Sequence, residues 1–206
     1  MSFDSRVWKI GKILIVISIA GFVLKPLIGV LFLFIFAAHL LFFREPVFKA
    51  PVGTAPLAPA YGKIIEITEV MEERFLKQAA YKIGIFLSVF DPHITLSPVA
   101  GTLRYLQYVP GKCINALLQE SSLKNESNWM GFSGDEQVLV RQLTGAIARR
   151  IYCDVKIGEA VDRAKKVGVI CYGSRVECYV AKSKFKPSVQ IGDYVKAGQT
   201  ILGEWQ

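Results

Sequence analysis

The residues whose chemistry is most direct are Gly173 and Ser174, which stand between two runs rich in β-formers. The flanking runs, residues 169–172 and 175–180, predict strands that hold this dipeptide in place. Glycine leaves its own carbonyl uncovered because it has no Cβ, and a serine hydroxyl one residue later could attack that carbonyl to form an ester. Most Gly-Ser pairs belong to turns, so the dipeptide alone does not establish a function.

Few other side chains could take part in such chemistry. His93 is the only histidine besides His39, and His39 lies within a long apolar run, so an imidazole acid or base outside that run must be His93. A structural role for His93, capping the turn at residues 91–92, is the alternative. Arg141 and Arg149 could bind a phosphate or carboxylate through their planar guanidinium groups, although solvated surface arginines fit the sequence equally well.

The four cysteines predict neither a metal site nor a disulfide framework. Cys113, Cys153, Cys171 and Cys178 form no C-x-x-C pair and stand inside apolar runs. We therefore expect buried thiols in a reducing compartment, and no metal.

The first 43 residues (1–43) predict a membrane-anchoring helical hairpin. The hydrophobic fraction of 52% and the mean hydropathy of +0.36 are high for a soluble domain. Two apolar runs, 13–24 and 27–43, are separated by Lys25-Pro26, and cations both precede and follow the pair. The positive-inside rule then places both ends on the cytoplasmic side of the cell membrane. A secretory signal peptide is the alternative, but the apolar region is long and has no clear small-x-small cleavage site.

The charge of the chain fits an anionic partner. Its formal net charge is +8 at pH 7. Lipid headgroups are favoured over nucleic acid, because the sequence has no recognition helix, zinc pattern or basic stripe interleaved with aromatic residues.

A proline-rich linker (44–58) and a mainly β domain (59–206) follow the hairpin. Short β-like runs separated by turn residues predict an α+β fold built on an antiparallel sheet or barrel. These runs are residues 63–70, 81–90, 101–108, 137–142, 167–172, 175–181 and 200–205. The apolar spacing of residues 139–151 also fits a helix. Trp129 and Phe132, close to Gly131 and Gly134, suggest an exposed loop.

An internal echo predicts two similar units in this domain. The segment 155–161, V-K-I-G-E-A-V, recurs 34 residues later as V-Q-I-G-D-Y-V, and 59–64 is weakly similar to 98–103. Such repeats suggest supersecondary units that meet about a pseudo-twofold axis. Residues 189–202 also resemble a segment of lipoyl and biotinyl domains. The sequence therefore predicts a barrel-like sandwich related to lipoyl-type barrels, although the lysine hairpin that carries their cofactor is absent.

Taken together, these blocks resemble one known family, the short-form phosphatidylserine (or archaetidylserine) decarboxylase proenzymes. The resemblance runs from about Arg44 to the C-terminus, and each block is weak alone. The blocks are F-R-E-P at 43–46, P-A-Y-G at 59–62, I-F-L-S-V-F-D-P-H at 85–93, S-P-V-A-G at 97–101, P-G-K at 110–112, S-S-L-K-N-E-S-N at 121–128, V-R-Q-L-T-G at 140–145, I-A-R-R-I at 147–151 and G-S-R-V at 173–176.

The resemblance implies an activity and a cofactor. In this family the serine attacks the preceding carbonyl, and β-elimination and hydrolysis leave a pyruvoyl group on the new N-terminus. Here cleavage between Gly173 and Ser174 would give a large and a small chain. The pyruvoyl ketone would bind the amine of a membrane phospholipid, phosphatidylserine or a related serine lipid, and accept electrons as carbon dioxide leaves. A homodimer is also implied.

Two positions depart from the family pattern. Where the family usually has an aspartate that supports self-processing, this chain has Tyr61, and a position that is commonly arginine in short forms is Leu96. Neither side chain replaces a carboxylate or a cation at neutral pH. The alternative function is therefore an unprocessed, inactive membrane-bound relative that binds lipid or acts as a scaffold. A lipoyl-like carrier or adaptor is a second alternative, which the missing lysine hairpin disfavours.

Overall fold

The computed structural model describes residues 2–117, 120–146, 150–171 and 174–206. The chain forms two compact units, Met1–Val47 and Phe48–Gln206. Each is described by itself below.

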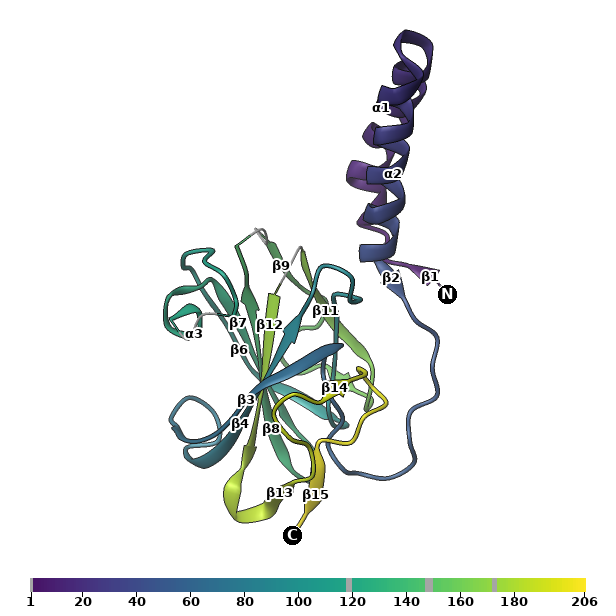
Figure 1. The fold of residues 1–206 in the computed structure, drawn as a ribbon. Helices are drawn as coiled ribbons and strands as arrows, with labels where there is room; N and C mark the ends of the chain where they lie inside the picture. Colours follow the sequence, from purple (N-terminus) through teal and green to yellow (C-terminus); the bar gives the residue numbers. More distant parts are fainter. Residues whose placement is uncertain (1, 118–119, 147–149, 172–173) are drawn as a thin grey trace. The chain divides into compact units, whose positions relative to one another are not determined.

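The first unit is a helical hairpin, as predicted. Helix α1 (Val7–Leu24) and helix α2 (Pro26–Phe42) are joined at Lys25, and proline at the first position of α2 suits a helix start because its missing N–H needs no partner there. Short strands β1 (Ser2–Phe3) and β2 (Arg44–Glu45) pair where the hairpin begins and ends (Figure 1). By length and hydropathy, α1 is long enough to cross a membrane, whereas α2 is a shorter apolar helix.

Small and polar residues bring the two helices close together. A Cβ added to Gly21 would lie 2.8 Å from the backbone nitrogen of Gly29, so the backbones approach closely at this point. Ser18 Oγ donates a hydrogen bond to the Gly29 carbonyl at 2.9 Å. At the other end of the hairpin, His39 Nε2 lies 3.0 Å from the Val7 carbonyl oxygen. His39 therefore joins the two helices.

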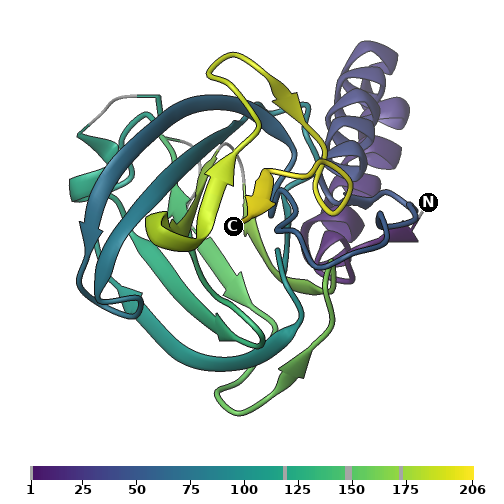
Figure 2. The ribbon, with the colours of Figure 1, turned by 90° about the horizontal axis from the view of Figure 1, so that it is seen from below.

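The second unit is built on an antiparallel sheet of eight strands that curls into a half-barrel (Figures 1 and 2). The spatial order is β10-β6-β7-β8-β12-β4-β3-β14. The long strands are β3 (Gly62–Glu72), β4 (Gln78–Leu87), β6 (Gly101–Val109), β7 (Ser127–Ser133), β8 (Gln137–Thr144) and β12 (Ser174–Ala181), and the edges are β10 (Ala160–Val161) and β14 (Tyr194–Val195).

Smaller elements complete the unit. Strand β11 (Lys166–Cys171) lies between β5 (Ile94–Leu96) and β9 (Arg150–Cys153), and β13 (Phe185–Pro187) pairs with β15 (Gly203–Trp205). Figure 2 shows the eight-stranded sheet curving around the β13–β15 pair. A short helix, α3 (Ser121–Lys124), precedes β7, and a 3-10 turn, η1 (Lys182–Lys184), precedes β13.

The predicted pseudo-twofold repeat is visible in the hydrogen bonds. Gly158 and Gly192 both have positive φ, +88° and +102°, in equivalent turns before β10 and β14. Gly158 donates its N–H to the carbonyl of Leu103 at 2.9 Å, and Gly192 donates to Ile64 at 2.8 Å. Counted from the edge inward, strands β10, β6, β7 and β8 therefore correspond to β14, β3, β4 and β12. The pseudo-twofold axis passes between β8 and β12. The barrel-like, mainly β architecture is confirmed.

The two faces of the sheet pack against different clusters, because successive side chains on a strand point to opposite faces. On β12, Val176 and Cys178 belong to the main apolar core, whereas Tyr179 belongs to a smaller cluster with Leu139 and Trp129. The same alternation places charged side chains of β12 on the face of the smaller cluster.

Residues 48–58, which the sequence assigned to a linker, lie along the second unit. Arg163 donates hydrogen bonds to the carbonyls of Pro51 and Ala55, and Leu57 donates its N–H to the Pro98 carbonyl at 3.0 Å. These contacts give the segment a fixed path although its prolines exclude a helix.

Two expectations were wrong, and one ambiguity is resolved. Residues 137–144 form strand β8, which confirms the strand predicted at 137–142, and pairing with β7 and β12 overrides the helix-like spacing that begins at residue 139. Trp129 and Phe132 are buried in strand β7 and do not form an exposed loop. Gly131 between them allows a close approach of the Phe75 ring, which would lie 2.7 Å from a Cβ added at this position. Cys153 is an exposed residue and Cys113 is half-buried, whereas Cys171 and Cys178 are buried as expected.

Candidate active site

Ser174 is the first residue of β12 and occupies a buried position at the centre of the sheet. It pairs with Leu87 of β4 on one side and with Thr144 of β8 on the other. Its exposed fraction is 0%, and its Oγ has no hydrogen-bond partner among the described residues. A buried hydroxyl without a partner is uncommon because it loses its bonds to water, so the site merits a chemical explanation. Gly173 and Arg149 lie outside the described residues.

His93 is buried just before β5, and its ring is held by a backbone carbonyl. The Nδ1 atom lies 2.7 Å from the carbonyl oxygen of Asp91. Because a carbonyl only accepts, Nδ1 carries the proton, and this tautomer leaves the Nε2 lone pair as the basic position. The carboxylate of Asp91 in turn accepts bonds from the Ser88 N–H at 2.8 Å and the Tyr194 hydroxyl at 2.5 Å. The turn that presents the carbonyl to His93 is therefore fixed from both sides.

The sheet pairing places His93 and Ser174 on connected elements. The carbonyl of His93 accepts the N–H of Ile170 at 3.1 Å, and Ile94 pairs with Val169 of β11. Strand β11 ends at Cys171, three residues before Ser174. His93 thus lies beside the strand that leads into the candidate cleavage point.

A buried relay of hydrogen bonds joins the same two regions, and the sequence did not predict it. Asn128 Nδ2 donates to Gln142 Oε1 at 3.1 Å, and Gln142 Nε2 donates to Thr95 Oγ1 at 2.9 Å. Gln142 stands two residues before Thr144, the strand partner of Ser174, and Thr95 stands two residues after His93. The available signal was a polar residue at 142, in phase with the inward-facing valines of its strand.

The two departures from the family pattern lie on neighbouring backbone segments. Tyr61 and Leu96 are both buried, and the Leu96 N–H donates to the Pro59 carbonyl at 2.8 Å. The Tyr61 hydroxyl accepts a long bond, 3.4 Å, from Gln199 Nε2. A buried carboxylate or a buried cation standing alone would be costly, and this chain has neither at the two positions.

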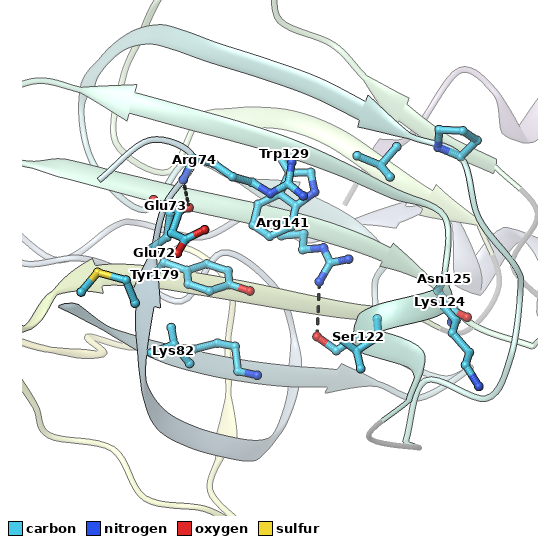
Figure 3. Close-up of a pocket in the computed structure, with 15 residues that line it drawn as sticks. Glu72, Glu73, Arg74, Lys82, Ser122, Lys124, Asn125, Trp129, Arg141 and Tyr179 are labelled. Carbon is cyan, nitrogen blue, oxygen red and sulfur yellow. Dashed lines mark hydrogen bonds between the residues drawn. The ribbon is translucent and has the colours of Figure 1, made fainter. Parts of the chain in front are cut away.

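Arg141 points to the other face of the sheet, so the structure does not bring it together with Ser174. It lines a pocket of about 620 Å³ with Trp129 and Tyr179, and Figure 3 shows it reaching toward Ser122 of α3. Its guanidinium carbon lies 4.3 Å from the centre of the Trp129 ring, a cation–π contact.

A network of buried charges extends from Arg141 along this face. Glu177 accepts from Arg141 at 3.3 Å and from Arg175 at 2.9 Å. Arg175 also pairs with Glu66, which Lys82 contacts at 2.6 Å. Burial alone would raise the pKa of Glu66, but its two cationic neighbours outweigh that effect and lower it.

The tyrosine in this pocket stays protonated. Burial, together with the nearby Glu177 carboxylate, raises the pKa of Tyr179 far above its usual value. Its hydroxyl donates to Glu177 at 2.6 Å. Among the residues that the structure describes, no group of three or more His, Cys, Asp or Glu side chains is arranged to hold a metal ion.

The comparisons with known proteins agree with this geometry. A family model described as phosphatidylserine decarboxylase matches residues 35–203. A relative from Carboxydothermus hydrogenoformans is 38% identical over 91% of this chain and 89% of its own length. Relatives from Nitrosomonas europaea (41% identical, 80% of this chain and 76% of theirs) and Ralstonia nicotianae (40%, 79% and 76%) are similar. All three are named phosphatidylserine decarboxylase proenzyme. The chain therefore belongs to the phosphatidylserine decarboxylase family of carboxy-lyases.

Proposed function

We propose that this protein cleaves itself between Gly173 and Ser174 and then decarboxylates phosphatidylserine, or a related serine phospholipid, to the ethanolamine phospholipid and carbon dioxide. The observation that carries the proposal is the buried, unpartnered Oγ of Ser174 at the start of a central strand. The family to which the chain belongs supports the substrate class.

The proposed self-cleavage proceeds in three steps. Ser174 Oγ attacks the carbonyl carbon of Gly173, the C–N bond breaks, and the proton of the hydroxyl passes to the released amine, which leaves an ester. Loss of the α-proton of residue 174 then expels the Gly173 carboxylate and forms a carbon–carbon double bond. Water hydrolyses the resulting enamine, releases ammonia and leaves a ketone at the new N-terminus.

His93 is the proposed base for the first step. Its Nδ1–H is committed to the Asp91 carbonyl, so Nε2 is the nitrogen that can accept a proton. In a Ser-His-Asp arrangement a carboxylate fixes the tautomer of the imidazole. Here a backbone carbonyl in a fixed turn performs that orientation, which supports processing even though residue 61 is tyrosine. A carbonyl carries no full charge, so it stabilises the imidazolium less than a carboxylate would.

The residues around position 174 fit a pyruvoyl group. The group would be attached covalently to β12, where Ser174 already places a buried polar atom with no partner. Thr144 and Gln142 provide polar side chains on the same face of the neighbouring strand, β8. When present, a pyruvoyl carbonyl supplies the electron sink that decarboxylation of an amino acid headgroup requires and that no natural side chain offers.

The remaining parts of the proposal concern location and partners. The apolar helix α1 supports association with the cell membrane, with both hairpin ends on the cytoplasmic side by the positive-inside rule. The large and small chains would remain one particle, and a homodimer stays a prediction. Binding of the substrate headgroup by Arg141 or Arg149 also stays a prediction.

Intact-mass measurement of the purified protein tests the proposal. The expected result is two fragments, residues 1–173 and 174–206, with the smaller one blocked by a ketone that reacts with hydroxylamine. Ser174→Ala is expected to remain one chain of 22.9 kDa with no decarboxylase activity, whereas the matched control Ser183→Ala, at an exposed serine, is cleaved normally. A single unmodified chain in the wild type would instead support the unprocessed relative, which the neutral pair Tyr61 and Leu96 favours.

A further inference from the structure

Strongly exposed apolar side chains lie at the end of the sheet that carries Ser174. Phe90 is 79% exposed and Leu123 is 87% exposed, and Val89 is exposed as well. Each would be stabilised by transfer from water to an apolar medium. We call these three side chains, together with Lys112 and Lys124, the docking surface.

The strand register shows that these residues flank Ser174. Leu87 pairs with Ser174, and Val89 and Phe90 follow Leu87 directly. On the other side, Thr144 pairs with Ser174, and Asn125 Nδ2 donates to the Thr144 carbonyl at 2.7 Å, which places the end of α3 beside this strand end. The side chain of Leu123 stands at the rim of the pocket that contains Arg141. The two apolar projections thus stand on either side of the same strand end.

Hydrogen bonds tie both projections to the sheet. The Asp91 N–H donates to the Ser88 carbonyl at 3.0 Å and the Asp91 carboxylate accepts from Ser88, so the turn that carries Val89 and Phe90 is closed at its base. On α3, Ser122 Oγ donates to the buried Glu177 at 2.8 Å. Because the backbone of each projection is already held, little backbone freedom is lost when its apolar side chains bind a partner.

The charges around the docking surface suit an anionic lipid surface. Lys112 and Lys124 are exposed, and Arg150 is exposed at the nearby start of β9. Glu120 pairs with Lys124 at 2.5 Å, and Glu126 is half-buried. The chain as a whole carries a net charge of +8. Cations beside apolar side chains are the combination that binds the interface of a membrane containing acidic lipids.

From these observations we propose that the docking surface inserts into the headgroup region of a phospholipid bilayer and holds the Ser174 end of the domain against it. This inference rests on the proposed function, because a two-chain lipid keeps its headgroup at the bilayer surface and the reacting atom must reach it there. It adds that the β domain itself contacts lipid, through the turn that also orients His93 and through α3.

Photo-crosslinking in the full-length protein tests the contact directly. Benzoylphenylalanine replaces Phe90 in one variant and Met71 in a matched control, since Met71 is also strongly exposed, at 65%. The control lies near the end of β3, where Met71 pairs with Ala79 of β4, about 26 Å along β4 from Leu87. Both proteins are reconstituted in vesicles of phosphatidylcholine with a minority of phosphatidylserine, irradiated and analysed by mass spectrometry.

The expected result is a lipid adduct at position 90 and little or none at position 71. Equal yields at the two positions would overturn the proposal, and so would a crosslink at position 90 to a second copy of the chain in place of lipid. Self-cleavage is scored on the same samples. A wild-type protein that stays intact would refute the proposed function, whereas the adduct pattern would still report whether the surface touches lipid.

Kinetics provide a second readout. Phe90→Ser is expected to raise KM for phosphatidylserine in vesicles by roughly tenfold. Loss of a phenylalanine side chain that enters the bilayer should weaken membrane binding by about this factor. The value of kcat at saturating substrate is expected to change much less. Met71→Ser is expected to change neither constant, and an unchanged KM for Phe90→Ser would contradict the docking surface.

Discussion

Replacing Gln142 with leucine is the sharpest test of how the sheet supports Ser174 and His93. Leucine has a similar volume but no amide, so it removes the bond to Thr95 at 2.9 Å and the bond to Asn128 at 3.1 Å. All three side chains are buried, so neither Thr95 nor Asn128 gains water in exchange. The change therefore removes the bridge between β8 and β5 without opening a cavity.

The expected cost follows from these contacts. Each of the two buried groups left without its partner, on Thr95 and Asn128, costs about 1–3 kcal/mol, and this penalty already includes the lost hydrogen bond. Better burial of the leucine side chain offsets about 1–2 kcal/mol. The free energy of unfolding should thus fall by about 3 kcal/mol, a large part of the roughly 5–15 kcal/mol typical of a domain.

Urea unfolding of the full chain in detergent micelles, followed by tryptophan fluorescence, to which the buried Trp129 contributes, measures this change. The Ser174→Ala background keeps every sample as one chain. Gln137→Leu is the matched control, because Gln137 is exposed on the same strand and its replacement should change the free energy by less than about 0.5 kcal/mol. In the self-cleaving background, Gln142→Leu should also slow cleavage, since β5 carries the segment that positions His93.

A double-mutant cycle separates the relay from general destabilisation. Thr95→Val removes the hydroxyl that accepts from Gln142, so the double variant should be about 1–2 kcal/mol more stable than the sum of the two single effects predicts. Strict additivity, or a cost for Gln142→Leu below about 1 kcal/mol with cleavage at the wild-type rate, would refute the argument that the relay supports the site.

Three further predictions concern the buried charges and thiols. Glu177→Gln leaves two buried arginines short of a counter-charge and should cost about 3–5 kcal/mol of unfolding free energy, whereas Glu69→Gln, at an exposed pair, should cost less than about 1 kcal/mol. The folded state lowers the pKa of Glu66 from 4.5, so its contribution to stability is present above that pH and is lost as the pH falls through the lower folded value. Glu66→Gln should therefore flatten the acid limb of a plot of urea midpoint against pH, and an unchanged slope would contradict the assignment. Burial raises the pKa of the Cys178 thiol to about 12, so iodoacetamide should not modify it in the native protein. Cys153 is an exposed residue, but burial of its thiol also raises that pKa, so its modification should increase as the pH rises, as peptide mapping would show.

Much of the β framework could be predicted because its strands carry their own local signals. The runs at 63–70, 101–108 and 175–181 match β3, β6 and β12 within two residues at each end, and the echo of 155–161 in 189–195 predicted two similar units, each of which contains an edge strand, β10 or β14. Local composition and repeated glycine turns were sufficient for these elements.

The errors arose where long-range contacts decided the structure. Strand β7 was not predicted because Gly131 usually indicates a loop, and here it admits the ring of Phe75 from a distant hairpin. A helix pattern over 139–151 was overridden by neighbours on both sides of β8.

The candidate site was predictable only in part, for the same reason. Ser174 and His93 stand in recognisable motifs, but the partners that orient them come from distant segments. The bond between Gln142 and Thr95 spans 47 positions, and Tyr194 reaches Asp91 across 103 positions. Single residues of common type at such separations leave no pattern that periodicity or spacing can reveal.

The central place of β12 has a consequence for the life of the molecule after the proposed cut. Residues 174–206 run through the middle of the large sheet, then through β13, β14 and β15, so the two products stay interlaced and their stoichiometry is fixed at one to one without any search for a partner. The same arrangement makes unfolding of the cleaved protein harder to reverse than unfolding of the precursor. Once both pieces are unfolded and diluted, recovery becomes a second-order encounter that depends on concentration, whereas the precursor folds as a single molecule.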